Sequence, residues 1–504
     1  MCLAGTRANI LDDIMEFLTA PAADISTLRI VLLTGVVGCG KTAIAHSVAK
    51  SCAQHSSPML GSSFFFSCEF DERRRPDKLF STVSRDICDR DSTFRASICN
   101  AVDEERALVS APMSRQFDGL ILKPAKDASP GRTYPLAIIL DALDALDEGY
   151  NENLLGVLEQ SVALVPSEFR FIITTRNDAT IIQRLRNLSH VSLKEVNIRD
   201  TTNCQDVGMF VAHRLGDMAR RHGTQDLLDD NLLTRFNRHT EGHFLWAATV
   251  LKYVDASVSP TEQLDDLLNN KDLLDTRATE KMNKLYADIL SKCPWHDRHF
   301  ERRYQPCLGA LIALRRPLSV SSIGKLLHDS NAGAVFRALC SLLIGALSPD
   351  QPVQIAHSSL RDFVTRCNQS GNSAHTRFAI SESHHSQRLA LCCIVVLNSE
   401  LPKLRPRVAF IFDDEREAGN TLNLMDGDIT EHVWYACEYW INHLQDVKTA
   451  SDELRKALAD FLEEGVLIWM AVCAMKGMYF GVGNFYRWSK VWVSSNLSID
   501  ISLT

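Results

Sequence analysis

The strongest constraint in this sequence is a glycine-rich run that joins an apolar segment to a helix-forming one. Residues 35–42 read Gly-Val-Val-Gly-Cys-Gly-Lys-Thr, which matches the pattern G-x-x-x-x-G-K-[ST]. The apolar segment 29–34 precedes the run, and the segment 43–50, rich in helix-forming residues, follows it. A strand, a glycine turn and a helix in this order gather main-chain amides and the positive end of a helix dipole around an anion. The run therefore predicts a phosphate-binding loop.

Each residue type in this loop has an expected task. Glycines let the backbone curl around phosphate oxygens, Lys41 is expected to contact the β- and γ-phosphates, and the hydroxyl of Thr42 is expected to ligate Mg²⁺. A plain glycine turn before a helix is the structural alternative, and the flanking strand and helix patterns make it the weaker one. The candidate nucleotide-binding residues of the loop are Gly35, Gly38, Cys39, Gly40, Lys41, Thr42 and Ala43.

A second acid is expected to help hold the metal from the end of another buried strand. The apolar run 136–140 ends in Asp141, so we assign the Walker B role to Asp141, together with Thr42 as a magnesium ligand. An Asp after a strand is also a common turn or helix-capping residue. Asp144, Asp147 and Glu148 follow closely, and one of them is expected to polarise the attacking water. Spacing does not say which, and we list Asp144 as the catalytic candidate.

A third strand candidate, 170–175, ends in Arg176. Ligands bind at the carboxyl ends of strands in open α/β sheets, so Arg176 is a candidate sensor of the γ-phosphate. A surface arginine that caps the sheet is the alternative interpretation.

Five short apolar runs, at 29–34, 62–66, 136–140, 170–175 and 191–196, alternate with longer amphipathic stretches. Continuous rather than alternating hydrophobicity is typical of strands buried on both faces, so we expect an open parallel α/β sheet with helices on both sides. Beyond residue 200 apolar residues recur at helical spacing. Three helices and a small hairpin between 307 and 366 predict a winged helix, and a polar loop is expected from 402 to 428.

Composition excludes several other classes of protein. The 504 residues carry 54 Lys and Arg against 62 Asp and Glu, a net charge of −8, which argues against a general coat for nucleic acid. The fifteen cysteines are odd in number and never spaced Cys-x-x-Cys, so neither a disulfide framework nor a zinc framework is expected. No secretory signal, membrane segment or 20 to 50 residue repeat is visible. A cytoplasmic location is the default expectation.

Six short motifs in a characteristic order resemble the NACHT NTPases of fungal NOD-like receptors, in particular the nephrocystin-3-like module that precedes WD repeats in mushroom-forming fungi. They are Gly-Thr-Arg at 5–7, the loop at 35–42, and the segments 138–144, 172–176, 242–248 and 357–363. The resemblance runs from residue 1 to about 370 and continues more weakly to about 475. It implies a helical lead-in (1–27), a P-loop core (28–200), a small helical domain with a connector (201–300), a winged helix (301–370) and a C-terminal helical domain (371–504).

The resemblance also assigns roles residue by residue. Lys41 and Thr42 match the phosphate and Mg²⁺ positions, Asp141 the Walker B acid and Arg176 the sensor, while Arg7 and His357 become candidate cofactor-binding residues. His357 resembles the winged-helix histidine that touches bound ADP in related switch ATPases; a helix-capping histidine is the plainer alternative.

Two departures from the family pattern matter. Ala145 stands where the Walker B motif usually has a Glu, and a methyl group cannot accept a proton, so slow hydrolysis is expected unless Asp144 or Asp147 substitutes. The Gly-x-Pro that contacts adenine in many members reads Gly-His-Phe at 242–244.

The leading hypothesis is a switch of the NACHT and STAND class that binds ATP or ADP with Mg²⁺, forms a homo-oligomer in its ATP state, and acts on a protein partner that the sequence does not identify. A multiple-turnover remodelling ATPase and a degenerate nucleotide-binding scaffold are the alternatives. We expect the chain to be a stand-alone switch, a truncated gene product or a fragment of a longer receptor.

Overall fold

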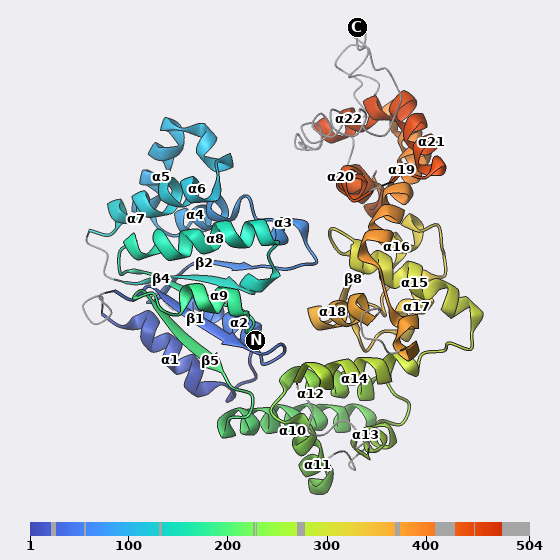
Figure 1. Cartoon of the computed structure of the whole chain (residues 1–504), viewed down its shortest axis with the longest axis horizontal. Helices are drawn as coiled ribbons and strands as arrows, with labels where there is room; N and C mark the ends of the chain where they lie inside the picture. Colours follow the sequence, from blue (N-terminus) through green and yellow to red (C-terminus); the bar gives the residue numbers. More distant parts are fainter. Residues whose placement is uncertain are drawn as a thin grey trace. The chain divides into compact units, whose positions relative to one another are not determined.

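The computed structural model divides the chain into two compact units, Met1–Leu285 and Tyr286–Thr504 (Figure 1). The boundary falls within helix α14 (Ala278–Ser291), inside the segment expected to hold the small helical domain and its connector. The structure describes residues 1–21, 27–54, 57–130, 134–224, 227, 229–269, 278–367, 373–408, 429–447 and 449–475.

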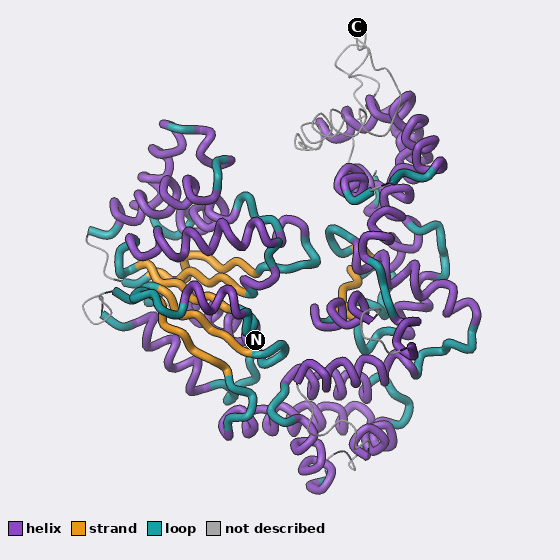
Figure 2. Tube along the Cα trace, in the orientation of Figure 1, coloured by secondary structure: helices purple, strands orange, loops and turns teal. Residues whose placement is uncertain are grey.

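A five-stranded sheet forms the centre of the first unit (Figure 2). Its strands are parallel and lie in the order β2-β3-β4-β1-β5, which confirms the predicted open parallel sheet. Strand β4 therefore separates β1 from β3, and the carboxyl ends of all five strands meet at one edge. The strands are β1 (Ile30–Gly35), β2 (Met59–Phe65), β3 (Leu136–Asp141), β4 (Phe169–Thr174) and β5 (Val191–Val196).

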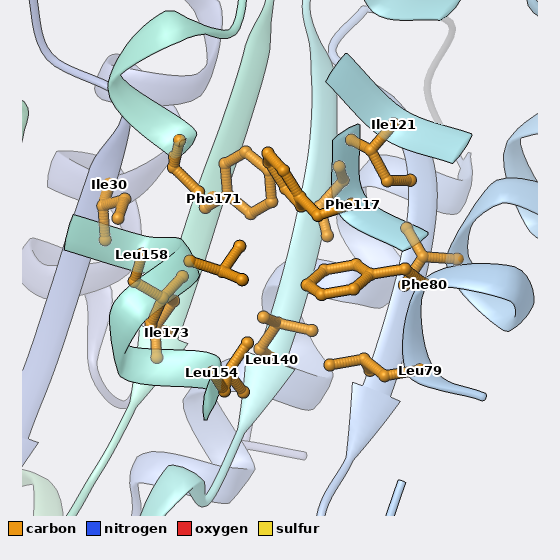
Figure 3. Packing of buried hydrophobic residues seen from close by; sticks show 14 of the residues in the cluster. Ile30, Leu79, Phe80, Phe117, Ile121, Leu140, Leu154, Leu158, Phe171 and Ile173 are labelled. Carbon is orange, nitrogen blue, oxygen red and sulfur yellow. The ribbon is translucent and has the colours of Figure 1, made fainter. Parts of the chain in front are cut away.

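Helices cover both faces of the sheet because its inner strands are apolar on both sides. Residues that alternate along β1 and β3 belong to two separate hydrophobic clusters. One cluster includes side chains of α1 (Ala8–Thr19) and α2 (Lys41–Gln54). Figure 3 shows the other, where Phe80 and Phe117 pack edge to face over Leu140, with ring centroids 5.0 Å apart. Its helices are α4 (Leu79–Cys88), α5 (Ser92–Glu104), α6 (Met113–Phe117), α7 (Lys123–Ala128), α8 (Glu148–Gln160) and α9 (Ala179–Leu185).

The rest of the first unit is helical, as expected for the residues after 200. Polar side chains begin two of its helices: Asp229 caps α11 and His243 caps α12, each accepting a main-chain amide of the first turn. Gly223, at φ +67°, ends the longest one. The helices are α10 (Thr201–His222), α11 (Asp230–Thr240), α12 (Phe244–Asp255), α13 (Pro260–Asn269) and α14.

The second unit begins with the order of elements expected for a winged helix. Three helices, α15 (Arg298–Ala313), α16 (Val320–Leu326) and α17 (Ala332–Ala338), precede the hairpin of β7 (Leu343–Ile344) and β8 (Pro352–Ile355) and then α18 (Ser358–Arg366). The sequence did not reveal the two-residue strand β6 (Leu318–Ser319), which pairs antiparallel with β8.

Four further helices complete the described part of the second unit: α19 (Glu382–Val408), α20 (Glu431–Gln445), α21 (Asp452–Asp460) and α22 (Val466–Met475). The prediction of a polar loop from 402 is wrong for its first residues, since α19 continues through Pro402 to Val408. Leu401 and Leu404 are buried on this helix, and their burial outweighs the hydrogen bond that proline cannot make. Residues 409–428 of the predicted loop lie outside the described residues.

None of the helices within the described ranges combines the length and the apolar character needed to span a bilayer.

Candidate functional site

The glycine-rich run forms a tight loop between β1 and α2. Gly38 and Gly40 have φ angles of +76° and +96°, a conformation that other residues rarely adopt. A Cβ at Gly35 would lie 2.8 Å from the Sγ atom of Cys39 and 3.0 Å from the carbonyl oxygen of Val196. Three glycines of the motif are therefore required by the shape of the loop itself.

The main-chain amides of this loop are available to a ligand. Within the described part of the chain, the N–H groups of Gly38, Gly40, Lys41 and Thr42 donate to no other protein group. Two of these amides belong to the first residues of α2, where the helix dipole is positive. Unpaired amides at a helix start form a site for an anion, and phosphate oxygens are the acceptors that suit it best.

Lys41 adds a positive charge to these amides. Its side chain is largely buried, and its Nζ atom donates to the carbonyl oxygens of Gly35 at 2.8 Å and Val36 at 3.0 Å. The Sγ atom of Cys39 lies 3.7 Å from the same nitrogen. The ammonium group therefore lies beside the loop with the unpaired amides. The sequence predicts that it contacts phosphate oxygens at this place.

Asp141 ends β3 and lies next to the start of α2. Its Oδ1 atom accepts a hydrogen bond of 2.6 Å from the hydroxyl of Thr174, and its carboxylate also accepts one from the hydroxyl of Thr42. Burial raises the pKa of the Asp141 carboxyl, and these two hydrogen bonds oppose the rise. The structure therefore brings together Thr42 and Asp141, the two predicted magnesium ligands, from elements that are far apart in sequence.

Thr174 is a site residue that the sequence analysis missed. Besides donating to Asp141, its hydroxyl accepts the amide of Ala142 at 2.9 Å, so one side chain orients both the carboxylate and the turn that follows it. Ala142 needs this support because its φ of +62° is unusual for a residue with a Cβ. The only signal in the sequence is the polar pair Thr174 and Thr175 at the end of an apolar strand.

Asp144 and Arg176 form an ion pair. Asp144 Oδ1 accepts the amide of Arg176 at 2.8 Å, and Arg176 Nε lies 2.9 Å from Asp144 Oδ2. Asp144, the catalytic candidate, and Arg176, the sensor candidate, are therefore paired with each other at the carboxyl ends of β3 and β4.

Of the other two acids in this segment, Asp147 pairs with arginines and the side chain of Glu148 is not described. Asp147 is paired with Arg75 at 2.6 Å and with Arg74 at 3.2 Å. The side chain of Glu148 lies outside the described residues. In the described part of the chain, neither Asp144 nor Asp147 has a carboxylate without a cationic partner.

Arg7 contacts the loop through a carbonyl oxygen. Its backbone is left-handed, with φ +61°, and its amide donates to Asp206 Oδ2 at 3.0 Å. The Nη2 atom donates to the carbonyl oxygen of Cys39 at 2.6 Å, and the guanidinium group lies 4.8 Å from the ring centre of Phe244. Arg7 therefore connects the lead-in, the loop and the helical domain.

His357 belongs to the second unit, where it caps α18. Its Nδ1 atom accepts the amide of Ser359 at 3.1 Å, as in the capping interpretation of the sequence. The contact of His357 with a bound nucleotide stays a prediction.

Mg²⁺ and a nucleoside phosphate fit the groups at this site. Magnesium is usually held by one or two carboxylates or hydroxyls and completed by phosphate oxygens and water, and Thr42 with Asp141 supplies such a partial set. The free amides and Lys41 supply the phosphate contacts.

Comparison with known proteins agrees with this geometry. The family described as Nephrocystin 3, N-terminal matches residues 6–176, a range that contains Arg7, the loop, Asp141 and Arg176. The curated relative vegetative incompatibility protein HET-E-1 of Podospora anserina is 23% identical over 489 residues, which cover 89% of this chain. Both matches support a NACHT-type NTPase. This chain spans about a third of the length of HET-E-1, 33%.

Two solved structures resemble this chain weakly. One is a STAND ATPase with a tetratricopeptide repeat sensor from Pyrococcus horikoshii, with a TM-score of 0.39 and 12% identity, covering 94% of this chain and 57% of that one. The other is the Drosophila origin recognition complex bound to DNA, with a TM-score of 0.31 and 11% identity, covering 71% of this chain and 86% of that one.

Proposed function

We propose that this chain is a nucleotide-dependent signal-transduction switch that binds ATP or ADP together with Mg²⁺. The observation that carries the proposal is the loop at 35–42, whose unpaired amides lie beside the hydrogen-bonded pair of Thr42 and Asp141. Nucleotide phosphates bind the amides and Lys41, while Thr42 and Asp141 hold the metal. Arg176, whose Nε atom is paired with Asp144, is the residue that senses the γ-phosphate.

Hydrolysis in this switch is slow. A general base must stand within hydrogen-bond reach of the attacking water, and Ala145 has no group that accepts a proton. Asp144 is the carboxylate nearest in sequence, and both of its oxygens face Arg176. With both oxygens engaged by Arg176, Asp144 is not positioned to orient the attacking water.

The relative HET-E-1 supports the biological setting that we propose. A vegetative incompatibility protein supports a role in fungal self and non-self recognition or innate immunity. In this proposal, exchange of ADP for ATP opens the helical domains against the core, and the open form oligomerises and engages a protein partner.

The test combines three measurements on the purified chain. Mass spectrometry identifies the nucleotide that co-purifies, light scattering reports the molecular mass before and after exchange for ATP, and phosphate release reports turnover. A switch retains nucleotide, gains mass with ATP and turns over well below ~1 s⁻¹. A turnover near the ordinary enzyme median of ~10 s⁻¹ would favour a remodelling ATPase instead. Absence of any bound nucleotide, with no binding of added ATP or ADP, contradicts the proposal.

A further inference from the structure

The carbonyl oxygens of the phosphate-binding loop are all occupied by hydrogen-bond donors. Five consecutive carbonyls, from Gly35 to Cys39, each accept a bond. Lys41 serves the first two, and the remaining three are served by residues from outside the loop. These outside donors are His243 Nε2 to Val37 at 2.8 Å, Leu245 N to Gly38 at 3.1 Å and Arg7 Nη2 to Cys39 at 2.6 Å. We call Arg7, His243 and Leu245 the carbonyl brace.

Occupied carbonyls and unpaired amides in one loop have a common cause. A peptide unit is planar, and its C=O and N–H bonds point in opposite directions. Donors that hold the carbonyls on the outer side of the loop therefore turn the adjoining amides toward the inner side. Through the carbonyls of Val37 and Cys39 the brace thus orients the amides of Gly38 and Gly40, two of the four unpaired amides. None of its three donors needs to touch the nucleotide.

His243 makes two hydrogen bonds with its two ring nitrogens. Nδ1 accepts the amide of Trp246 at 3.1 Å and so caps α12, and this leaves Nε2 as the protonated nitrogen that donates to Val37. The residue is 1% exposed, so water does not replace either partner. One imidazole therefore joins the start of α12 to the loop.

The start of α12 is pressed directly onto the loop. A Cβ at Gly38 would lie 2.3 Å from the Cβ of Leu245, so only glycine allows the contact. Gly242 is equally confined, because a Cβ there would lie 1.8 Å from the carbonyl oxygen of Ile198. Asn203 Nδ2 donates to the carbonyl oxygens of both Gly242, at 2.7 Å, and Ile198, at 2.5 Å. A displacement of α12 therefore has to disturb the loop.

We propose that His243 is a positioning residue that couples the placement of helix α12 to the hold of the phosphate-binding loop on its nucleotide. Rearrangement of the helical domain breaks the carbonyl brace, frees the loop carbonyls and speeds nucleotide release. This inference rests on the proposed nucleotide switch and adds the contact through which the helical domain controls it.

Two substitutions of His243 distinguish its hydrogen bond to Val37 from its capping of helix α12. In His243→Asn the short amide still accepts the Trp246 N–H, since Asn is a good N-cap, but it cannot reach Val37. In His243→Gln the longer side chain places an N–H donor at about the position of the histidine Nε2 atom. It can therefore still bond Val37, but it cannot cap α12. His239→Asn is the matched control, because His239 is a buried histidine of the same helical domain that bonds the carbonyl oxygen of Arg235.

The experiment measures release of a fluorescent ADP analogue from the full chain, and amide hydrogen exchange of residues 36–42 in the nucleotide-free protein. Loss of one hydrogen bond predicts about three- to tenfold faster release for His243→Asn and faster exchange of the loop amides. His243→Gln and His239→Asn are expected to stay within about twofold of the unmodified chain.

Each outcome of this experiment supports or overturns the inferred role of His243. Unchanged release and exchange in His243→Asn would overturn the inference, and so would equal acceleration in His243→Asn and His243→Gln, which would reduce His243 to a helix cap. Should the unmodified chain bind no nucleotide, the proposed function fails, and the hydrogen exchange of the loop still tests the brace by itself.

Discussion

Lys41 shows how much one side chain contributes to the candidate site. Its buried ammonium lies beside the loop that carries the free amides. We predict that Lys41→Ala weakens ATP and ADP binding at least about tenfold, since a charge-assisted hydrogen bond contributes roughly 1.5–3 kcal/mol. Isothermal titration measures the change. Lys50→Ala, an exposed position on the same helix, is the control, and equal affinities of the two variants would refute the site assignment.

Substitution of Ala145 is expected to change the rate of ATP hydrolysis rather than nucleotide binding. A positioned general base contributes roughly 10²–10⁴ to a rate, so we predict that Ala145→Glu raises ATP hydrolysis at least about tenfold. Ala145→Gln has the same size but cannot accept a proton and is expected to leave the rate unchanged. Steady-state phosphate release distinguishes the variants. A flat rate for the Glu variant would mean that another group, such as Asp144, already serves as the base.

At the scale of elements, the end of β4 offers two neighbouring hydroxyls with opposite surroundings. Thr174 is bonded to Asp141 and Ala142, whereas the buried hydroxyl of Thr175 has no partner in the described part of the chain. Thr174→Val leaves a buried carboxylate and an amide without their partner, and we predict a loss of about 2 kcal/mol in the free energy of unfolding.

Thr175→Val is the matched comparison for this strand. It removes an unpartnered hydroxyl at nearly constant volume and is expected to be neutral or slightly stabilising. Urea unfolding of the nucleotide-free protein measures both variants. Equal destabilisation would show that the hydroxyl of Thr174 does not support β3.

The start of α12 makes the first unit sensitive to acid. Burial lowers the pKa of His243 from 6.5 to about 4; the hydrogen bond to Val37 opposes this, Lys281 adds to the lowering, and Glu241 opposes it. Between these two values the unfolded chain binds a proton that the native chain does not, so stability falls as the pH falls from about 6.5 toward 4. The expected loss from His243 between about pH 7 and pH 5 is roughly 2 kcal/mol.

His243→Asn has no titrating group at this position and therefore measures the contribution. We predict that the unmodified chain loses about 2 kcal/mol more than the variant on the same acidification, as measured by urea unfolding. Equal losses in the free energy of unfolding of the two proteins would show that a group other than His243 causes the acid sensitivity.

At the scale of the whole molecule, the loop contacts given above lie within the first unit. Arg7, Asp206, His243 and Leu245 lie within Met1–Leu285, as do the magnesium candidates. We therefore predict that a fragment ending after α14, at residue 292, binds ADP within about threefold of the full chain.

A shorter fragment ending at residue 200 tests the role of the helical domain. It keeps the loop, Thr42 and Asp141 but lacks two members of the carbonyl brace, so weaker ADP binding and faster release are expected. Circular dichroism verifies that each fragment is folded. Failure of the longer fragment to bind, while the full chain binds, would show that the second unit completes the site.

The sequence by itself determined the elements of this protein that arise from local patterns. Continuous apolar runs identify the five parallel strands, because a strand buried on both faces needs them, and the glycines at 35–42 identify the loop, because only glycine adopts its backbone angles. Asp141 and Arg176 follow from the rule that parallel strands end at one edge.

Only the tertiary structure decided which side chains meet. Strand order places Thr174 on Asp141 and Arg176 on Asp144, across 33 and 32 residues, and the docking of α12 places His243 on Val37, across 206. No local periodicity records such pairs, since a hydrogen bond depends on atoms brought within about 3 Å by packing of distant segments. Helix α19 also passes Pro402 for a tertiary reason, the burial of its leucines.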